Sequence, residues 1–293
     1  MRITEKKLFN IAVACIIAVT LFCFCADYIG KHPSAFDKKT PPVLTEELRE
    51  LFSTRPYYSL GVNKELRGEV SVQVFFVDDD ESEWDSESIS LFLDGPIKEG
   101  LRFLEKQAGR YGVELKFKTQ YHATTVSGEK DKLRYKGAVL DGSDGTHTHD
   151  MIEQIAGNFG YYSTKEFYNS FKALSGGEVI FAAIVNRDGT STARNQLSDY
   201  GDDYVEHTII FANNLHSDAA IGKNSPRAST VAHEILHLFG APDLYIEKAT
   251  ERYTLYKYPN DIMLLDTRNL GRLEVSEFTA YTIGWVDSPP ELD

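Results

Sequence analysis

Cysteine is almost absent from this 293-residue chain. Its three cysteines, Cys15, Cys23 and Cys25, lie near the N-terminus, and no thiol follows them. The region after residue 26 therefore has no disulfide bond, no cysteine nucleophile and no metal site with sulfur ligands. A domain formed by this region must be stabilised by its core, with or without a metal bound through nitrogen and oxygen.

Positive charge is also scarce, because 31 Lys and Arg residues stand against 44 Asp and Glu residues, giving a net charge of −13. Such a surface repels phosphate backbones, so nucleic acid is not an expected partner. A hydrophobic content of 42% with 12% aromatic residues excludes a disordered chain. The sequence has no internal repeat and no low-complexity tract.

The N-terminus has the pattern of an export signal. Three basic residues among the first seven precede an apolar run, Ile11–Ala26. The run lacks an Ala-x-Ala cleavage pattern and is slightly shorter than the ~20 residues that span a bilayer. We predict a signal peptide or a membrane anchor over 1–26, with 8–26 as the tether of an anchored form. The rest would then be extracytoplasmic, either secreted or membrane-anchored; a buried N-terminal helix is the alternative.

Residues 27–68 hold four of the ten prolines and one short amphipathic stretch. This composition is typical of a spacer that holds a domain away from a membrane. An ordered extension that packs on the domain is the equally weighted alternative. We assign the remainder, 69–293, to one domain.

Hydrophobic periodicity predicts an α/β fold for this domain. Strands are expected at Val70–Val77, Val113–Tyr121, Glu178–Asn186 and His207–Ala212. Helices are expected at Leu91–Arg110, with a restart at Gly95-Pro96, and, with interruptions, over Met151–Leu174. The first strand, helix and strand form a βαβ unit, which requires parallel strands.

Two polar clusters resemble metal sites only superficially. The acidic run Asp78–Glu83 lacks the glycine and the alternation of a calcium-binding loop, and we predict a solvated loop. His147-Thr-His149-Asp150 lies among Gly and Asp residues, and we predict a polar turn or helix cap.

The most informative segment is one predicted helix. Ser225 is suited to be its N-cap and Pro226 its first residue, and Gly240 is suited to end it. His233 and His237 are four residues apart and therefore lie on one side, opposite an apolar stripe. Two histidines that merely pack on a surface helix are the structural alternative.

This spacing suits a divalent metal, because two imidazoles one turn apart can direct nitrogens at one point. Glu234 lies beside that point, where it can take a proton from a metal-bound water and deliver it to a leaving amine. Gly240 turns the chain, which allows Asp243 to return as the third ligand. Two histidines, one carboxylate and an open position are typical of catalytic zinc, Zn2+.

The motif His233-Glu234-x-x-His237-x-x-Gly240-x-x-Asp243 resembles that of metzincin zinc metallopeptidases, in the variant with Asp as third ligand found in the snapalysin and immune inhibitor A groups. Gly240-Ala-Pro-Asp243-Leu-Tyr245 is similar to the latter group. The resemblance implies a twisted mixed sheet, an active-site helix and a C-terminal subdomain whose tight turn carries a methionine beneath the zinc.

Asn260-Asp-Ile-Met263 matches that turn, and Ser276–Trp285 is similar to the helix that closes such domains. Met263 could also be an ordinary core residue. Some metzincins carry a transition-state tyrosine two residues after this methionine, where the chain has Leu265. Tyr245, Tyr253, Tyr256 and Tyr258 are the candidates to replace it.

We therefore expect a zinc-dependent endopeptidase that acts on a peptide or protein substrate. The substrate would lie along an edge strand, for which His207–Ala212 is the candidate. A zinc hydrolase of a non-peptide amide bond and a non-catalytic binding protein are the alternatives. Glu274 and Glu277 are the rival third ligands, because other His-Glu-x-x-His peptidases use a Glu on a later helix. The sequence does not predict the oligomeric state.

Overall fold

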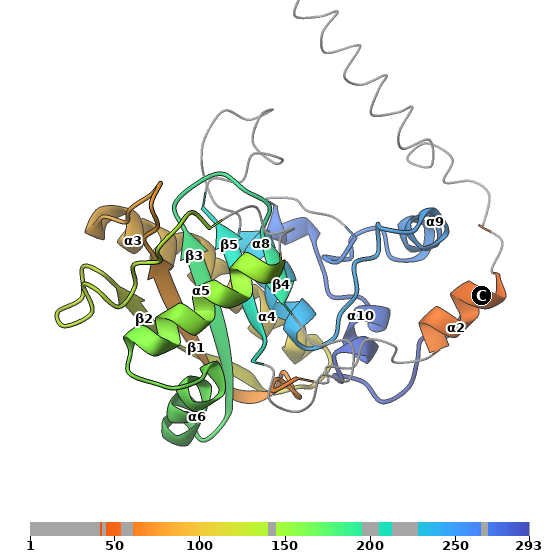
Figure 1. Ribbon diagram of the computed structural model, residues 1–293. Coiled ribbons are helices and arrows are strands. Elements are labelled where there is room, and N and C mark those ends of the chain that lie inside the picture. Colours follow the sequence, from red (N-terminus) through yellow and green to blue (C-terminus); the bar gives the residue numbers. More distant parts are fainter. Residues whose placement is uncertain are drawn as a thin grey trace, which may run out of the picture.

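The computed structural model describes residues 42, 45–53, 61–139, 145–194, 205–212, 228–264 and 269–292. Their centre is a five-stranded sheet of order β2-β1-β3-β5-β4 (Figure 1). The strands are β1 Gly68–Val77, β2 Leu115–Ala123, β3 Glu178–Val185, β4 Thr192–Arg194 and β5 His207–Phe211. The α-helices are α2 Glu46–Ser53, α3 Ser86–Phe92, α4 Lys98–Arg110, α5 Gly145–Asn158, α6 Thr164–Ser175, α8 Ala228–Leu238, α9 Lys248–Lys257 and α10 Glu277–Thr282.

The sheet is mostly parallel, which confirms the predicted α/β class. β1 pairs in parallel with both β2 and β3, and β3 pairs in parallel with β5. The predicted βαβ unit is therefore present. Among the described strands, β4 alone is antiparallel, against β5.

Helices cover both faces of the sheet (Figure 1). The side chains of β1, which alternate between the two faces, are therefore buried on both. Val72, Val74 and Phe76 pack with α4 and α8 in one core cluster. Phe75 and Val77 pack with α5 and α6 in the other. Strands buried on both faces have nearly continuous apolar sequences, as the β3 sequence does.

The prediction that His207–Ala212 forms the edge strand is wrong. β5 lies between β3 and β4, so the outer strand on this side is β4. The three residues Thr-Ala-Arg of β4 are all half-buried and give no hydrophobic alternation that a sequence pattern could detect.

The predicted restart of the helix at Gly95-Pro96 is also wrong. A π-helical turn, η2 Leu93–Ile97, contains Pro96 and joins α3 directly to α4. A wider turn tolerates the missing N–H of proline within one helical run. The run also begins earlier than predicted, at Ser86, where the Asp85 carboxylate accepts a hydrogen bond from the Ser88 N–H.

The acidic run beginning at Asp78 is not simply a solvated loop, because its first two residues are buried. Asp78 accepts hydrogen bonds from the Trp84 N–H and the Thr124 hydroxyl, both at 2.8 Å. Asp79 accepts from the Ser82 N–H at 2.7 Å and the Val139 N–H at 2.9 Å. Both carboxylates therefore fix the loops that follow β1.

Within 27–68, the described stretches 46–53 and 61–68 pack on the domain, which agrees with the ordered-extension alternative there. Phe52 of α2 is fully buried against Tyr253 and Phe278. The Trp285 indole donates to the Leu66 carbonyl at 2.7 Å. Residues 1–26, the predicted signal or anchor, lie outside the described residues. No helix in the described part of the chain is long and apolar enough to cross a membrane.

Candidate metal centre

Helix α8 carries the His-Glu-x-x-His motif and is buried nearly throughout. It packs against α4, β4 and β5. The close approach to α4 depends on Gly100, since a Cβ there would lie 2.7 Å from the Ala228 carbonyl oxygen. This packing holds the helix backbone, and with it both histidines, in a fixed position. The predicted caps, Ser225 and Pro226, lie outside the described residues.

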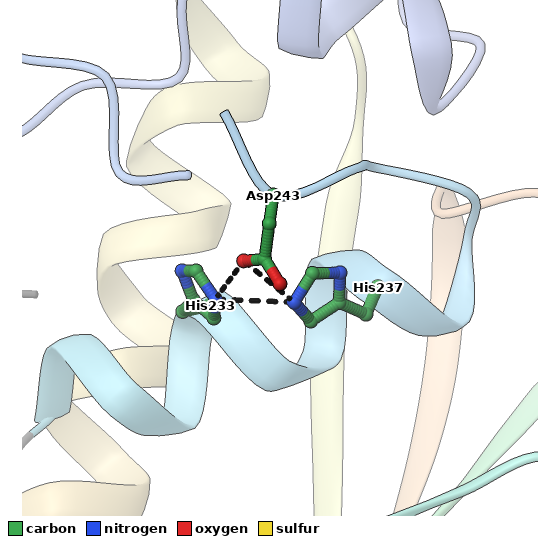
Figure 2. A group of neighbouring side chains, drawn as sticks. All are labelled: His233, His237 and Asp243. Atoms are coloured by element: carbon green, nitrogen blue, oxygen red, sulfur yellow. Dashed lines mark hydrogen bonds and ion pairs between the residues drawn. The ribbon is translucent and has the colours of Figure 1, made fainter. Parts of the chain in front are cut away.

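Gly240 reverses the chain after α8, as predicted, and its φ of +99° is one that favours glycine. Its N–H donates to the His237 carbonyl, and the Ala241 N–H donates to the Leu236 carbonyl. Farther on, the Leu244 N–H donates to the Met263 carbonyl at 3.0 Å. Asp243 is therefore fixed between two hydrogen-bonded points and returns over the helix (Figure 2).

Three atoms that could bind a metal, two imidazole nitrogens and one carboxylate oxygen, converge there (Figure 2). The Nε2 atoms of His233 and His237 are 3.1 Å apart. The Asp243 Oδ1 lies 3.1 Å from the first and 3.3 Å from the second. Among the described residues, these three form the one group of His, Cys, Asp and Glu side chains that could hold a metal ion.

The hydrogen bond at the Nδ1 atom of each imidazole ring determines whether its Nε2 atom carries a proton or a lone pair. Nδ1 of His233 donates to the Ile262 carbonyl at 3.0 Å, and Nδ1 of His237 donates to the Ala241 carbonyl at 2.7 Å. A neutral imidazole that donates from Nδ1 presents a lone pair at Nε2. Two lone pairs and a buried carboxylate oxygen without a hydrogen-bond donor then face one another. Such an arrangement favours a cation, either a proton or a metal ion, between the three atoms.

The electrostatics of the site agree with this conclusion. Burial lowers the pKa of His233, but a hydrogen bond to Asp243 and the negative charge of Glu234 outweigh burial and raise it to about 9, so without an ion a proton on Nε2 would take the place between the ring and the carboxylate. Burial would raise the pKa of Asp243, yet both histidines, when protonated, hold that pKa well below its ordinary value. The surroundings therefore favour positive charge between these side chains.

The spacing of the donor atoms fits zinc. Four ligands in a tetrahedron at about 2.0–2.1 Å from zinc are about 3.3 Å from one another. The three observed separations, 3.1, 3.1 and 3.3 Å, are close to that value. Nitrogen and oxygen donors without sulfur are also a common zinc set.

Glu234 is buried on α8 but is not part of this donor group. Its influence on the pKa of His233 places its charge near the group. This position is compatible with the predicted role of a proton acceptor rather than a ligand.

The turn that contains Met263 lies against the same site. Met263 is fully buried, and the Ile262 carbonyl beside it holds His233. Sequence reasoning missed Asp261, whose buried carboxylate accepts from the N–H groups of Met263 and Ser276 and from the Thr279 hydroxyl. The sequence signal that could have predicted this role is the position of Asp261, two residues before Met263 in a tight turn.

The rival ligands are held elsewhere. Glu274 pairs with Arg110 at 3.1 Å, and Glu277 is exposed in the first turn of α10.

Of the four candidate tyrosines, Tyr245 has a ring that stacks on His233, with centroids 6.4 Å apart. Tyr253 and Tyr258 are buried, and Leu265 lies outside the described residues. The polar turn or helix cap predicted at 147–150 is instead part of α5, where His149 pairs with Glu153 one turn away.

A comparison of the chain with protein-family models gives no match, and a comparison with curated proteins gives none either. The geometry of the site is therefore the basis of the functional argument.

Proposed function

We propose that this chain is a zinc-dependent endopeptidase of the metzincin type, with Asp243 as the third ligand. The observation that carries the proposal is the convergence of three hydrogen-bond acceptors, from His233, His237 and Asp243, at separations of 3.1–3.3 Å. The resemblance of the motif and of the Met263 turn to that family supports it.

The two histidines and Asp243 would hold the zinc. When bound, zinc would polarise the scissile carbonyl and make a water molecule more acidic. The Ile262 and Ala241 carbonyls contribute by fixing both imidazoles with Nε2 toward the ion. A rigid ligand set of this kind needs little reorganisation during the reaction.

Glu234 is the proposed general base and acid. Its carboxylate would take a proton from the attacking water and later deliver that proton to the leaving amine. The Glu234 carboxylate is buried, and its charge raises the pKa of His233, which places it close enough to the ligands to serve a zinc-bound water. A module that only binds metal has no use for such a base.

The substrate would lie in extended form along β4, in place of the predicted β5. Within the described strands β4 pairs only with β5, and it contacts α8. A peptide added to the other side of β4 would form main-chain hydrogen bonds near the motif helix. An extended polypeptide is the substrate class that such an edge suits best.

The decisive experiment combines metal analysis with cleavage profiling of the full-length chain. We expect one zinc per chain and cleavage of an unbiased peptide library, lost with a chelator and restored by zinc. Bound zinc without peptide cleavage would overturn the peptidase proposal. Cleavage of a non-peptide amide would then indicate the alternative hydrolase, and no turnover of any amide would indicate a binding protein.

We also propose that residues 1–26 export the protein, because basic residues precede an apolar run there. The domain should then be digested by protease added to intact cells or be found in the medium. A protein confined to the cytosol would contradict export. N-terminal sequencing of the mature protein distinguishes a cleaved signal from an anchor.

A further inference from the structure

A cavity of about 470 Å³ lies between the end of α4 and the segment 271–274. α4 contributes Lys106, Gln107 and Arg110 to its wall, and the facing segment contributes Arg272 and Glu274. Small-molecule sites in proteins have volumes of roughly 300–1,000 Å³. The cavity contains none of the candidate zinc ligands, and its role does not depend on the proposed function.

The cavity is positively charged although the whole chain carries a net charge of −13. Three cationic side chains in its wall, those of Lys106, Arg110 and Arg272, face a single carboxylate, Glu274. That carboxylate is already paired with Arg110, at 3.1 Å. Lys106 and Arg272 have no ion pair or hydrogen bond from their side chains in the described part of the chain. Two positive charges therefore remain without a partner there.

Gln107 adds an oriented hydrogen-bond donor. This side chain is only 4% exposed, and its Oε1 accepts from Arg110 at 2.7 Å and from the Val275 N–H at 3.2 Å. Because both partners are donors, the oxygen is identified and the amide cannot be flipped. Its Nε2 has no acceptor among the described residues. This nitrogen is not among the enclosed side-chain atoms that lack a partner, so it is open to the cavity, where a ligand atom can accept from it.

We propose that this cavity binds a small organic dianion, with the oxyanion groups held by Lys106, Arg272 and the Gln107 amide. Two unpaired cations match two negative charges, and both phosphate and carboxylate oxygens accept from lysine, guanidinium and amide donors. The cavity exceeds the size of a bare oxyanion, which favours a ligand with an organic part. A phosphate monoester and a dicarboxylate share this chemistry.

The test is isothermal titration of the zinc-loaded full-length chain with phenyl phosphate and with isophthalate at low ionic strength. The double variant Lys106→Ala/Arg272→Ala removes both unpaired cations. Arg102→Ala/Lys116→Ala is the matched control, because these exposed cations lie outside the cavity and the change in net charge is equal. Gln107→Glu retains the accepting oxygens of residue 107 but replaces its donor with a negative charge, which should repel an anion.

We expect the parent and the control to bind at least one of the two probes, and the stronger probe identifies the oxyanion. The cavity double variant and Gln107→Glu should each bind about tenfold or more weakly, because each loses charge-assisted or oriented hydrogen bonds. Failure of the parent to bind either probe would overturn the proposal. Unchanged binding to the cavity double variant would also overturn it, because the probe would then bind at another site, for example at the zinc.

Discussion

The Nδ1 of His233 donates to the carbonyl oxygen of Ile262 at 3.0 Å, and this bond joins α8 to a turn 29 residues farther along the chain. The same turn is held by the side chain of Asp261, which is fully buried. Asp261 accepts from the Met263 N–H at 2.6 Å and from the Thr279 hydroxyl at 2.7 Å. A chain of contacts thus runs from α10 through Asp261 and Ile262 to a candidate zinc ligand.

Asp261→Ala should therefore reduce both stability and zinc affinity. The change leaves three buried donors without an acceptor, and we expect a loss of roughly 3–5 kcal/mol in the free energy of unfolding. Disturbing a group that orients a ligand typically weakens metal binding about 10–100-fold. Urea denaturation and chelator competition measure the two effects.

Thr279→Val is the control, because it removes one of these hydrogen bonds and leaves both backbone donors satisfied. Its loss of stability should be about 1 kcal/mol, with zinc affinity nearly unchanged. An Asp261→Ala protein that binds zinc as tightly as the parent would show that the turn does not position His233.

Glu234→Gln should retain zinc and fold while losing activity. The amide keeps the size of the side chain but cannot take a proton from water, and general-base catalysis is worth about 10²–10⁴-fold in rate. The measurements are kcat on a peptide that the parent cleaves and zinc content by mass spectrometry. Equal kcat would contradict the assigned role, whereas loss of zinc would make Glu234 a ligand or a structural residue.

The parts of this structure that the sequence predicted are those with local periodicity. The strand β1 alternates and then turns apolar, the strand β3 is nearly continuously apolar, and the helix α8 has histidines at a spacing that fixes their common side. The reversal at Gly240 follows from the conformational freedom of one residue. Each of these inferences needs only neighbours in the chain.

The parts that were missed depend on distant contacts. β4 is a strand only because it pairs with β5, and its three residues carry no pattern of their own. The Ile262 and Ala241 carbonyls orient the histidines, but a backbone oxygen leaves no mark in a sequence. The burial of Asp78 and Asp79 likewise depends on donors far along the chain, such as Thr124 and Val139.

Tyr245→Phe tests whether a tyrosine assists the transition state. The ring of Tyr245 is inclined by 24° to the His233 ring, and the residue is 47% exposed, so a substrate can reach it. If its hydroxyl donates to the developing oxyanion, its removal should lower kcat about 10²–10³-fold with little change in KM. Tyr256→Phe is the control, since Tyr256 is 46% exposed on α9. Equal kcat in both variants would exclude the role.

Alkaline pH should destabilise the protein in part through Tyr111. Burial raises the pKa of Tyr111 to about 12 from an ordinary value of 10.0, although Arg110 opposes the shift. The folded state therefore retains this proton at a pH where the unfolded chain has lost it. The contribution to stability is complete below pH 10 and is lost as the pH rises to about 12.

Urea denaturation of the parent and of Tyr111→Phe between pH 8 and 12 measures this contribution. At pH 8 the variant should be about 1 kcal/mol less stable, because Tyr111 donates to the Val275 carbonyl. The difference should close above pH 10, where only the parent has a tyrosine at this position to ionise on unfolding. Tyr162→Phe, at a residue 99% exposed, should follow the parent at every pH. A constant difference across this range would contradict the assignment.

The identity of the third ligand is tested by three alanine variants. Asp243→Ala removes the oxygen that lies 3.1 and 3.3 Å from the two imidazole nitrogens. Glu277→Ala removes an exposed carboxylate from α10, and Glu274→Ala removes the partner of Arg110. We expect zinc affinity to fall in the first variant by more than the 10–100-fold typical of an outer contact, and to change little in the other two.

Chelator competition measures all three affinities, and far-UV circular dichroism shows that each variant is folded. Asp243→Asn distinguishes a ligand from a residue that merely shapes the turn, because asparagine suits a turn but lacks the negative charge. A turn residue would tolerate this change, whereas a ligand facing two lone pairs should not. Full zinc affinity in both Asp243 variants, with loss in Glu274→Ala or Glu277→Ala, would exclude the metzincin arrangement and assign the zinc a glutamate from the C-terminal region.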